Sequence, residues 1–198
     1  MSHGSGTKAV VAALLANTGI ALTKFVAFLL TGFASMLAES IHSLADAGNQ
    51  LLLLIGGRRS QREATDEHPF GYGRERYIYA FVVAIVLFSI GGVYTLYESV
   101  HKFAELDHLE VDTSRWQSYV PMVVLAVAIV LESLSFRTAI VEGNKSRGGS
   151  TWWQFVRTAK APELPVILLE DFAALMGLVF AFAAVGLTLI THDPVYDV

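Results

Sequence analysis

Long apolar runs constrain the fold of this chain more than any other feature. A helix needs about 20 mostly apolar residues to cross the hydrocarbon core of a membrane. Five stretches of about that length or more can be drawn, covering residues 8–30, 34–57, 78–100, 119–141 and 162–190. The sequence therefore predicts an all-α fold: a polytopic membrane helix bundle with five transmembrane helices, occupying residues 1–198 as one transmembrane domain.

The composition supports this class and excludes several others. Apolar residues make up 54% of the 198 residues and charged residues only 16%, which is unusual for a soluble domain. The chain contains no cysteine, so neither a disulfide framework nor a thiolate metal site can form. A net charge of −4 argues against a nucleic-acid partner. The partner that the composition implies is the lipid bilayer.

The distribution of positive charge predicts the orientation of the bundle. Eleven Lys and Arg residues fall at the N-terminus or around the loops before the third and fifth spans, whereas only Lys102 and Arg115 fall on the other side. Positive residues concentrate on the cytoplasmic side of membrane proteins. We therefore expect a cytoplasmic N-terminus. An odd number of spans then leaves the final "THDPVYDV" outside, so we expect a sixth span to follow Val198.

A few polar residues interrupt the predicted spans. A charged residue at the centre of a span costs about 2.5–3.5 kcal/mol on insertion scales, so each one suggests a function. The intramembrane polar residues are Asn17, Lys24, Glu39, His42, Asp46, Asn49, Glu132, Glu170 and Asp171.

His42 and Asp46 have the spacing of a half-site for a metal ion. Residues four apart lie on the same face of a helix, so one helix can offer an imidazole nitrogen and a carboxylate oxygen to one ion. That pair suits zinc and its neighbours iron, cobalt, nickel and manganese. The remaining ligands must come from another helix, and Glu170 and Asp171 are the obvious donors because their span is otherwise apolar. Only one of these two can face the pair, since adjacent helical residues point about 100° apart.

The spacing alone leaves other interpretations open. The His42–Asp46 pair could fix helix packing through a buried hydrogen bond, and Lys24 could form a structural ion pair with Glu39 or Glu132. The protein would then be a non-transporting membrane scaffold or assembly protein. Catalysis by an intramembrane metalloenzyme needs a water-activating metal and a general base. The zinc-hydrolase spacing HExxH does not occur in the chain, so we expect that it is not an enzyme.

Three ordered motifs carry a resemblance to a known family. "SMLAESIHSLADAGNQ" (35–50) followed by "HPFGYGRERY" (68–77) resembles the cation diffusion facilitators, which exchange metal ions for protons. "LLEDFAALMGL" (168–178) is similar to the branch that includes the mitochondrial zinc exporter and its bacterial relatives. The resemblance implies six spans, a cytoplasmic C-terminal domain and a homodimer. This chain would lack the sixth span and that domain.

The resemblance also implies ligands, a substrate and a location. The family's transport site uses one i, i+4 pair on the second span and one on the fifth. His42 and Asp46 match the first pair, and Asp171 matches the acidic member of the second. Ile167 then occupies a ligand position, and the substitute can be Glu170, a water molecule or Asn17 of the first span. The implied function is efflux of a divalent cation, zinc first and manganese, iron or cobalt next, across a bacterial plasma membrane.

Protons are the expected counter-ion. An imidazole changes charge near physiological pH. Metal binding requires neutral imidazole and ionised carboxylates, so a metal that binds displaces protons. Protons that enter from the far side would then expel the metal, and helix movements about the buried site would alternate its access.

Overall fold

The computed structural model describes residues 3–31, 34–94, 96–97, 100 and 119–191. Every regular element in these ranges is a helix, which confirms the all-α prediction. In chain order the elements are α1 (His3–Thr31), α2 (Ala34–Arg59), α3 (Glu75–Val86), the π-helix η1 (Leu87–Tyr94), α5 (Val120–Arg147), α6 (Trp152–Thr158) and α7 (Glu163–Thr191). Lys102 and Arg115, on which the predicted orientation partly rests, lie outside the described residues.

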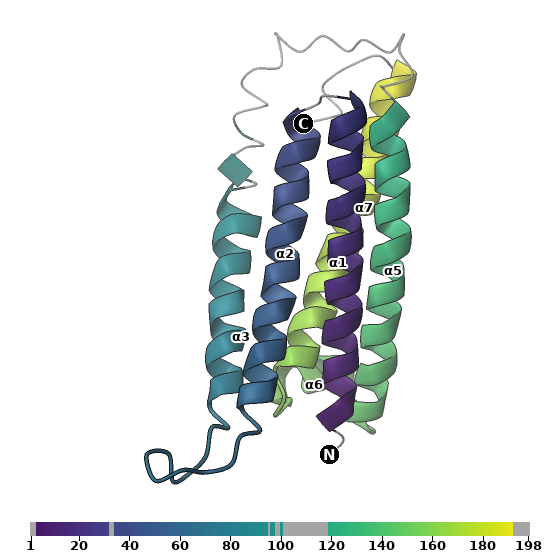
Figure 1. The fold of residues 1–198 in the computed structure, drawn as a ribbon. Helices are drawn as coiled ribbons and strands as arrows, with labels where there is room; N and C mark the ends of the chain where they lie inside the picture. Colours follow the sequence, from purple (N-terminus) through teal and green to yellow (C-terminus); the bar gives the residue numbers. More distant parts are fainter. Residues whose placement is uncertain (1–2, 32–33, 95, 98–99, 101–118, 192–198) are drawn as a thin grey trace.

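The long helices run side by side as a bundle with α1 near its centre (Figure 1). α1 packs mainly against α2 and α5, α5 packs against α7, and α2 packs against α3. The N-terminus, the loop between α2 and α3, and the short helix α6 lie at one end (Figure 1). We call this the basic end, because Arg58, Arg59, Lys145, Arg147 and Arg157 lie there in the helices that end or begin at it.

Three of the described helices are long and apolar enough to cross a membrane, judged by length and composition. They cover Gly6–Leu30, Val120–Arg147 and Glu163–Thr191. α2 is not among them, in keeping with the polar residues along its length. The third predicted span is divided between α3 and η1. The count of five spans therefore remains a prediction.

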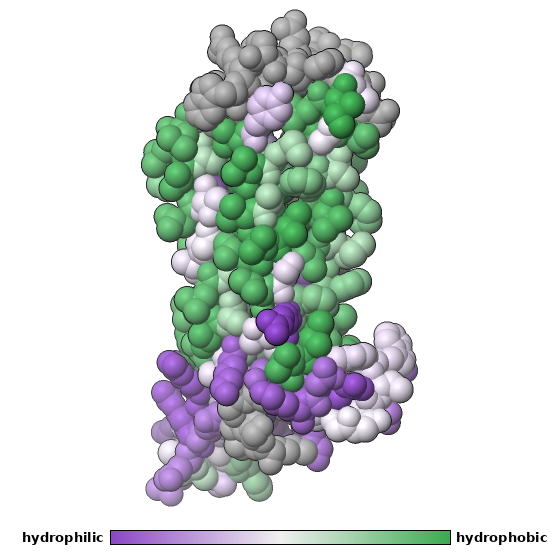
Figure 2. Space-filling model, turned by 90° about the vertical axis from the view of Figure 1, so that its right-hand side faces the viewer, coloured by the Kyte–Doolittle hydropathy of each residue, from purple (hydrophilic) through white to green (hydrophobic). Residues whose placement is uncertain are grey.

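The outer surface of the bundle is apolar. Large side chains such as Leu22, Phe81, Val123 and Phe180 are exposed on four different helices. Figure 2 shows a broad hydrophobic band around the middle of one face and hydrophilic residues gathered at the basic end. Soluble monomers rarely expose apolar patches of this extent. The exposed side chains instead match the hydrocarbon of a lipid bilayer, as in a multi-pass membrane protein.

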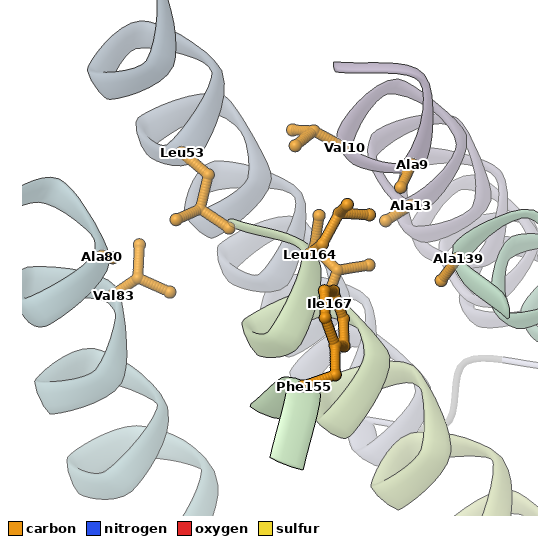
Figure 3. Close-up of a cluster of buried hydrophobic side chains, with 10 residues drawn as sticks. All are labelled: Ala9, Val10, Ala13, Leu53, Ala80, Val83, Ala139, Phe155, Leu164 and Ile167. Carbon is orange, nitrogen blue, oxygen red and sulfur yellow. The ribbon is translucent and has the colours of Figure 1, made fainter. Parts of the chain in front are cut away.

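Two apolar clusters hold the interior together. The larger one lies toward the basic end and joins the start of α1, the end of α2, α3, the end of α5, α6 and the start of α7 (Figure 3). Its members are Ala9, Val10, Ala13, Leu53, Ala80, Val83, Ala139, Phe155, Leu164 and Ile167. The smaller cluster contains Ala27, Met36 and Val124, toward the other end of α1, α2 and α5.

Between these two clusters lies a layer of polar side chains, which we call the polar layer. On α1, Asn17 and Lys24 lie between Ala13 of the larger cluster and Ala27 of the smaller one. α2, α5 and α7 contribute at corresponding depths. The members of the polar layer are Asn17, Lys24, His42, Asp46, Asn49, Gln50, Glu132, Ser135, Glu170 and Asp171.

Polar contacts tie α3 to the start of α7 at the basic end. The Arg76 guanidinium donates from Nε to Oε1 of Glu163 at 3.0 Å. The Tyr77 hydroxyl donates to the backbone carbonyl of Lys160 at 2.6 Å. Arg76 and Glu163 are 21% and 7% exposed, so this ion pair is shielded from water.

Candidate metal centre

His42 and Asp46 lie together on one face of α2, as their spacing predicts. Nε2 of His42 is 3.8 Å from Oδ2 of Asp46. Both side chains are partly exposed, at 39% and 27%. A separation of 3.8 Å is longer than a hydrogen bond, and it leaves both atoms able to turn toward a shared cation.

Asp171 takes a different position, on the face of α7 that meets α5. It is 1% exposed, and Oγ of Ser135 donates a hydrogen bond to its Oδ2 at 2.7 Å. Ile167, one helical turn earlier, is fully buried in the larger apolar cluster, which also contains Ala139 of α5. Positions 167 and 171 of α7 therefore share a face, and so do 135 and 139 of α5.

Glu170 is directed toward α2. Its carboxylate lies beside the side chain of Gln50 and close enough to Asp46 and Asp171 to interact electrostatically with both. Both of its carboxylate oxygens are buried and lack a hydrogen-bond partner of normal geometry among the described residues. Of the two adjacent acids of α7, Glu170 therefore faces the α2 stripe and Asp171 faces α5.

Glu132 of α5 joins these acids, although the sequence did not place it in the site. It is 2% exposed and interacts electrostatically with Asp171, Glu170 and Asp46, and with Lys24. Its signal in the sequence was its position as a single acid inside an apolar span. The sequence could not predict the rotation of α5 about its axis, and that rotation directs Glu132 inward.

The polar layer thus brings four acids from three helices close together with few positive groups. Lys24 interacts electrostatically with Glu132 and Asp46, but its Nζ forms an ion pair with Glu39 at 3.1 Å. Like charges in a medium of low dielectric repel one another strongly. A divalent cation or added protons would relieve that repulsion.

The predicted ligands are not gathered into one coordination shell. Among the described residues, no three His, Asp or Glu side chains lie close enough together to hold a metal ion. The structure places His42 with Asp46 on one side of the layer and Asp171 with Ser135 on another, and Glu170 lies between them. A cation held by both helices would require these side chains to move closer together.

Fold and site together define a multi-pass helical membrane protein with a buried acidic layer. Comparison with protein families identifies the family of membrane proteins to which the chain belongs. The cation efflux transmembrane domain matches residues 10–198, so the chain belongs to the cation efflux family. Members of this family are transporters and not enzymes.

Individual relatives agree with this assignment. The chain is 35% identical over 192 residues to the mitochondrial proton-coupled zinc antiporter SLC30A9 of Mus musculus, covering 96% of this chain and 33% of that protein. The Homo sapiens protein of the same name is 33% identical over the same shares. Metal tolerance protein C4 of Arabidopsis thaliana is 28% identical, over 96% of this chain and 41% of its own length. The chain spans about a third of the length of the zinc antiporters it matches.

Proposed function

We propose that this chain carries a divalent cation, zinc in the first instance, out of the cytoplasm in exchange for protons. We place the cation at His42 and Asp46 of α2 with Glu170 and Asp171 of α7. The observation that carries the proposal is the meeting of four acids from α2, α5 and α7 in one buried layer beside His42.

The chemistry of this layer fits the exchange of a metal for protons. Carboxylates and an imidazole bind divalent cations only after they lose their protons. Acids held this close together favour either a bound cation or protonation, because each lowers their mutual repulsion. Binding of one species therefore weakens binding of the other, which is the coupling that an antiporter requires.

The names of the relatives favour zinc and protons. The mouse and human relatives are named proton-coupled zinc antiporters, and the plant relative is named a metal tolerance protein. The imidazole of His42 together with the carboxylates beside it suits zinc, and also manganese, iron or cobalt. Zinc is therefore the first ion to test, and those three are the next.

We further propose how the transporter is arranged in the membrane. α2 and the continuous segment formed by α3 and η1 would cross the bilayer together with α1, α5 and α7, giving five spans. The basic end would face the cytoplasm, because positive residues concentrate on that side. A homodimer in a bacterial plasma membrane is the assembly that we expect from the family resemblance.

Two polar contacts favour a rival function. Asp171 is already hydrogen-bonded to Ser135, and Lys24 is already paired with Glu39. These contacts are what a scaffold with purely structural polar residues would use. Such a protein would bind no zinc at the polar layer, and its stability would not respond to the metal.

Zinc binding by the purified protein tests the proposal against this rival. Titration calorimetry in detergent should give a saturable heat for the wild-type protein that Asp46→Asn abolishes. Substitution of Thr188 by Val offers a matched control, because Thr188 is buried on the same helix as Glu170 but about 25 Å from Asp171 along the axis. Equal zinc binding by wild type and Asp46→Asn would refute the site, and no binding by wild type would favour the scaffold.

A further inference from the structure

Gln50 has no assigned role, and its surroundings are unusual for a buried amide. It lies one helical turn from Asp46, so His42, Asp46 and Gln50 form a continuous stripe along α2. Its side chain is 0% exposed. Neither Nε2 nor Oε1 has a hydrogen-bond partner of normal geometry among the described residues. Most buried polar atoms in proteins are paired, so each exception calls for an explanation.

The neighbours of Gln50 show what is missing. Its side chain faces the carboxylate of Glu170, whose two oxygens are also buried and unpartnered in the described part of the chain. Glu170 in turn interacts with Asp46. The Gln50 amide nitrogen could donate to Glu170 after a small rotation, but that bond would leave Oε1 of Gln50 without a partner among the described residues. The missing group is therefore a donor or a cation.

A cation satisfies this arrangement better than water. Water can bridge two acceptors, but it brings no positive charge to a place that holds at least two carboxylates. The amide oxygen of Gln50 and the carboxylates of Asp46 and Glu170 could all coordinate one divalent cation. Oxygen ligands of this kind suit manganese and other hard cations, whereas sites for zinc and its neighbours commonly include an imidazole.

We propose that the carboxamide oxygen of Gln50 is a further cation ligand, which completes an oxygen-rich set with Asp46 and Glu170. This inference rests on the proposed transport function and extends it. Gln50 would take the place of the ligand that Ile167 cannot provide, since Ile167 is packed in the apolar cluster. The set lies one turn nearer the basic end than the His42–Asp46 pair. Among the substrates already expected, it favours a cation that binds oxygen ligands well, so Mn²⁺ should bind as well as Zn²⁺.

Two variants of Gln50 and one control variant test the proposal. The measurement is the binding of a metal ion to the purified protein. Wild type, Gln50→Leu, Gln50→Glu and Thr188→Val are purified in detergent and titrated with MnCl₂ and with ZnCl₂. Gln50→Leu should weaken Mn²⁺ binding by about tenfold or more, because even second-shell changes weaken metal sites by about 10–100-fold. Zn²⁺ binding should weaken by less, since His42 remains. Gln50→Glu keeps an oxygen ligand and should bind both metals at least as well as wild type.

Thr188→Val is the matched control for removing a buried polar group. Thr188 is 5% exposed, and its Oγ1 also lacks a partner among the described residues. It lies 17 residues beyond Asp171 on the same helix. Its substitution should leave both affinities unchanged.

Thermal unfolding without metal separates a ligand from a structural amide. If Gln50 is a ligand, Gln50→Leu should be at least as stable as wild type without metal, because an unpartnered buried group has been removed. It should also lose the added stability that Mn²⁺ gives to wild type. A lower melting temperature without metal would mean that the amide is structural, and would overturn the proposal.

Several binding results would overturn the proposed role of Gln50. A loss of Mn²⁺ affinity well below tenfold in Gln50→Leu, an equal loss in Thr188→Val, or weakened binding by Gln50→Glu would overturn the role of Gln50. So would a wild type that binds Zn²⁺ but no Mn²⁺. If Asp46→Asn loses Zn²⁺ binding while Gln50→Leu keeps Mn²⁺ binding, only this inference fails. If wild type binds neither metal, the proposed function fails first.

Discussion

Substitution of Gly56 by alanine should destabilise the bundle through the contact of α2 with α3. A Cβ atom added at Gly56 would lie 2.5 Å from Cβ and 2.7 Å from Cγ of Tyr79. Carbon atoms in contact normally lie about 3.5–4.0 Å apart, so the two helices would have to separate by about 1 Å. Rotation of the Tyr79 side chain gives no relief, because its Cβ is fixed to the backbone. Overpacking of this kind costs about 1–3 kcal/mol.

A glycine-to-alanine substitution at a position with no close neighbours provides the reference stability. Gly177 has no heavy atom within 4 Å of an added Cβ, so Gly177→Ala adds a methyl group without a clash. Both variants gain helix propensity, about 1 kcal/mol at most. The difference in unfolding free energy between them therefore isolates the clash, and we expect Gly56→Ala to be less stable by about 1–3 kcal/mol.

Unfolding of the purified protein in detergent micelles, followed by circular dichroism as denaturant is added, measures this difference. Wild type is compared with both variants at one detergent concentration. Equal stability of Gly56→Ala and Gly177→Ala, or greater stability of Gly56→Ala, would show that α2 and α3 do not approach as closely as the structure places them.

Two other substitutions probe polar contacts of the interior. Ser135→Ala removes the donor to the Asp171 carboxylate and should cost about 1.5–3 kcal/mol of unfolding free energy, as hydrogen bonds to charged groups do; wild-type stability of this variant would contradict the contact. Arg76→Met breaks the shielded ion pair with Glu163 and should cost about 1–3 kcal/mol, less than a fully buried pair because Arg76 is partly exposed. Adding Glu163→Leu should recover much of that loss, and a double variant no more stable than Arg76→Met would refute the pairing.

Hydropathy and helical spacing predicted much of this fold. Long apolar runs predicted the helices because length and composition decide whether a segment suits lipid. The His42–Asp46 pairing followed from the geometry of a single helix. The sequence placed the first predicted helix at residues 8–30, and α1 covers His3–Thr31. The change to a π-helix at Leu87 had no comparable signal in hydropathy, because that property ignores backbone geometry.

The arrangement of side chains between helices could not be predicted in the same way. Whether Glu170 or Asp171 faces α2 depends on the rotation of α7, which is set by packing against α5. The roles of Ser135 and Glu132 depend on the rotation of α5 in the same manner. Gln50 ends the motif at residues 35–50, but nothing in the sequence distinguishes it from an ordinary helix residue. Its burial beside an unpartnered acid is a property of the assembled bundle.

Zinc-dependent proton movement in proteoliposomes tests the central claim most directly. Protein is reconstituted into vesicles that contain a pH indicator, and a zinc gradient is imposed across the membrane. Wild type and Thr188→Val should move protons when zinc is added, whereas His42→Ala and Asp46→Ala should not, although all four insert equally. Undiminished zinc-driven proton movement in both His42→Ala and Asp46→Ala would contradict a transport site on α2.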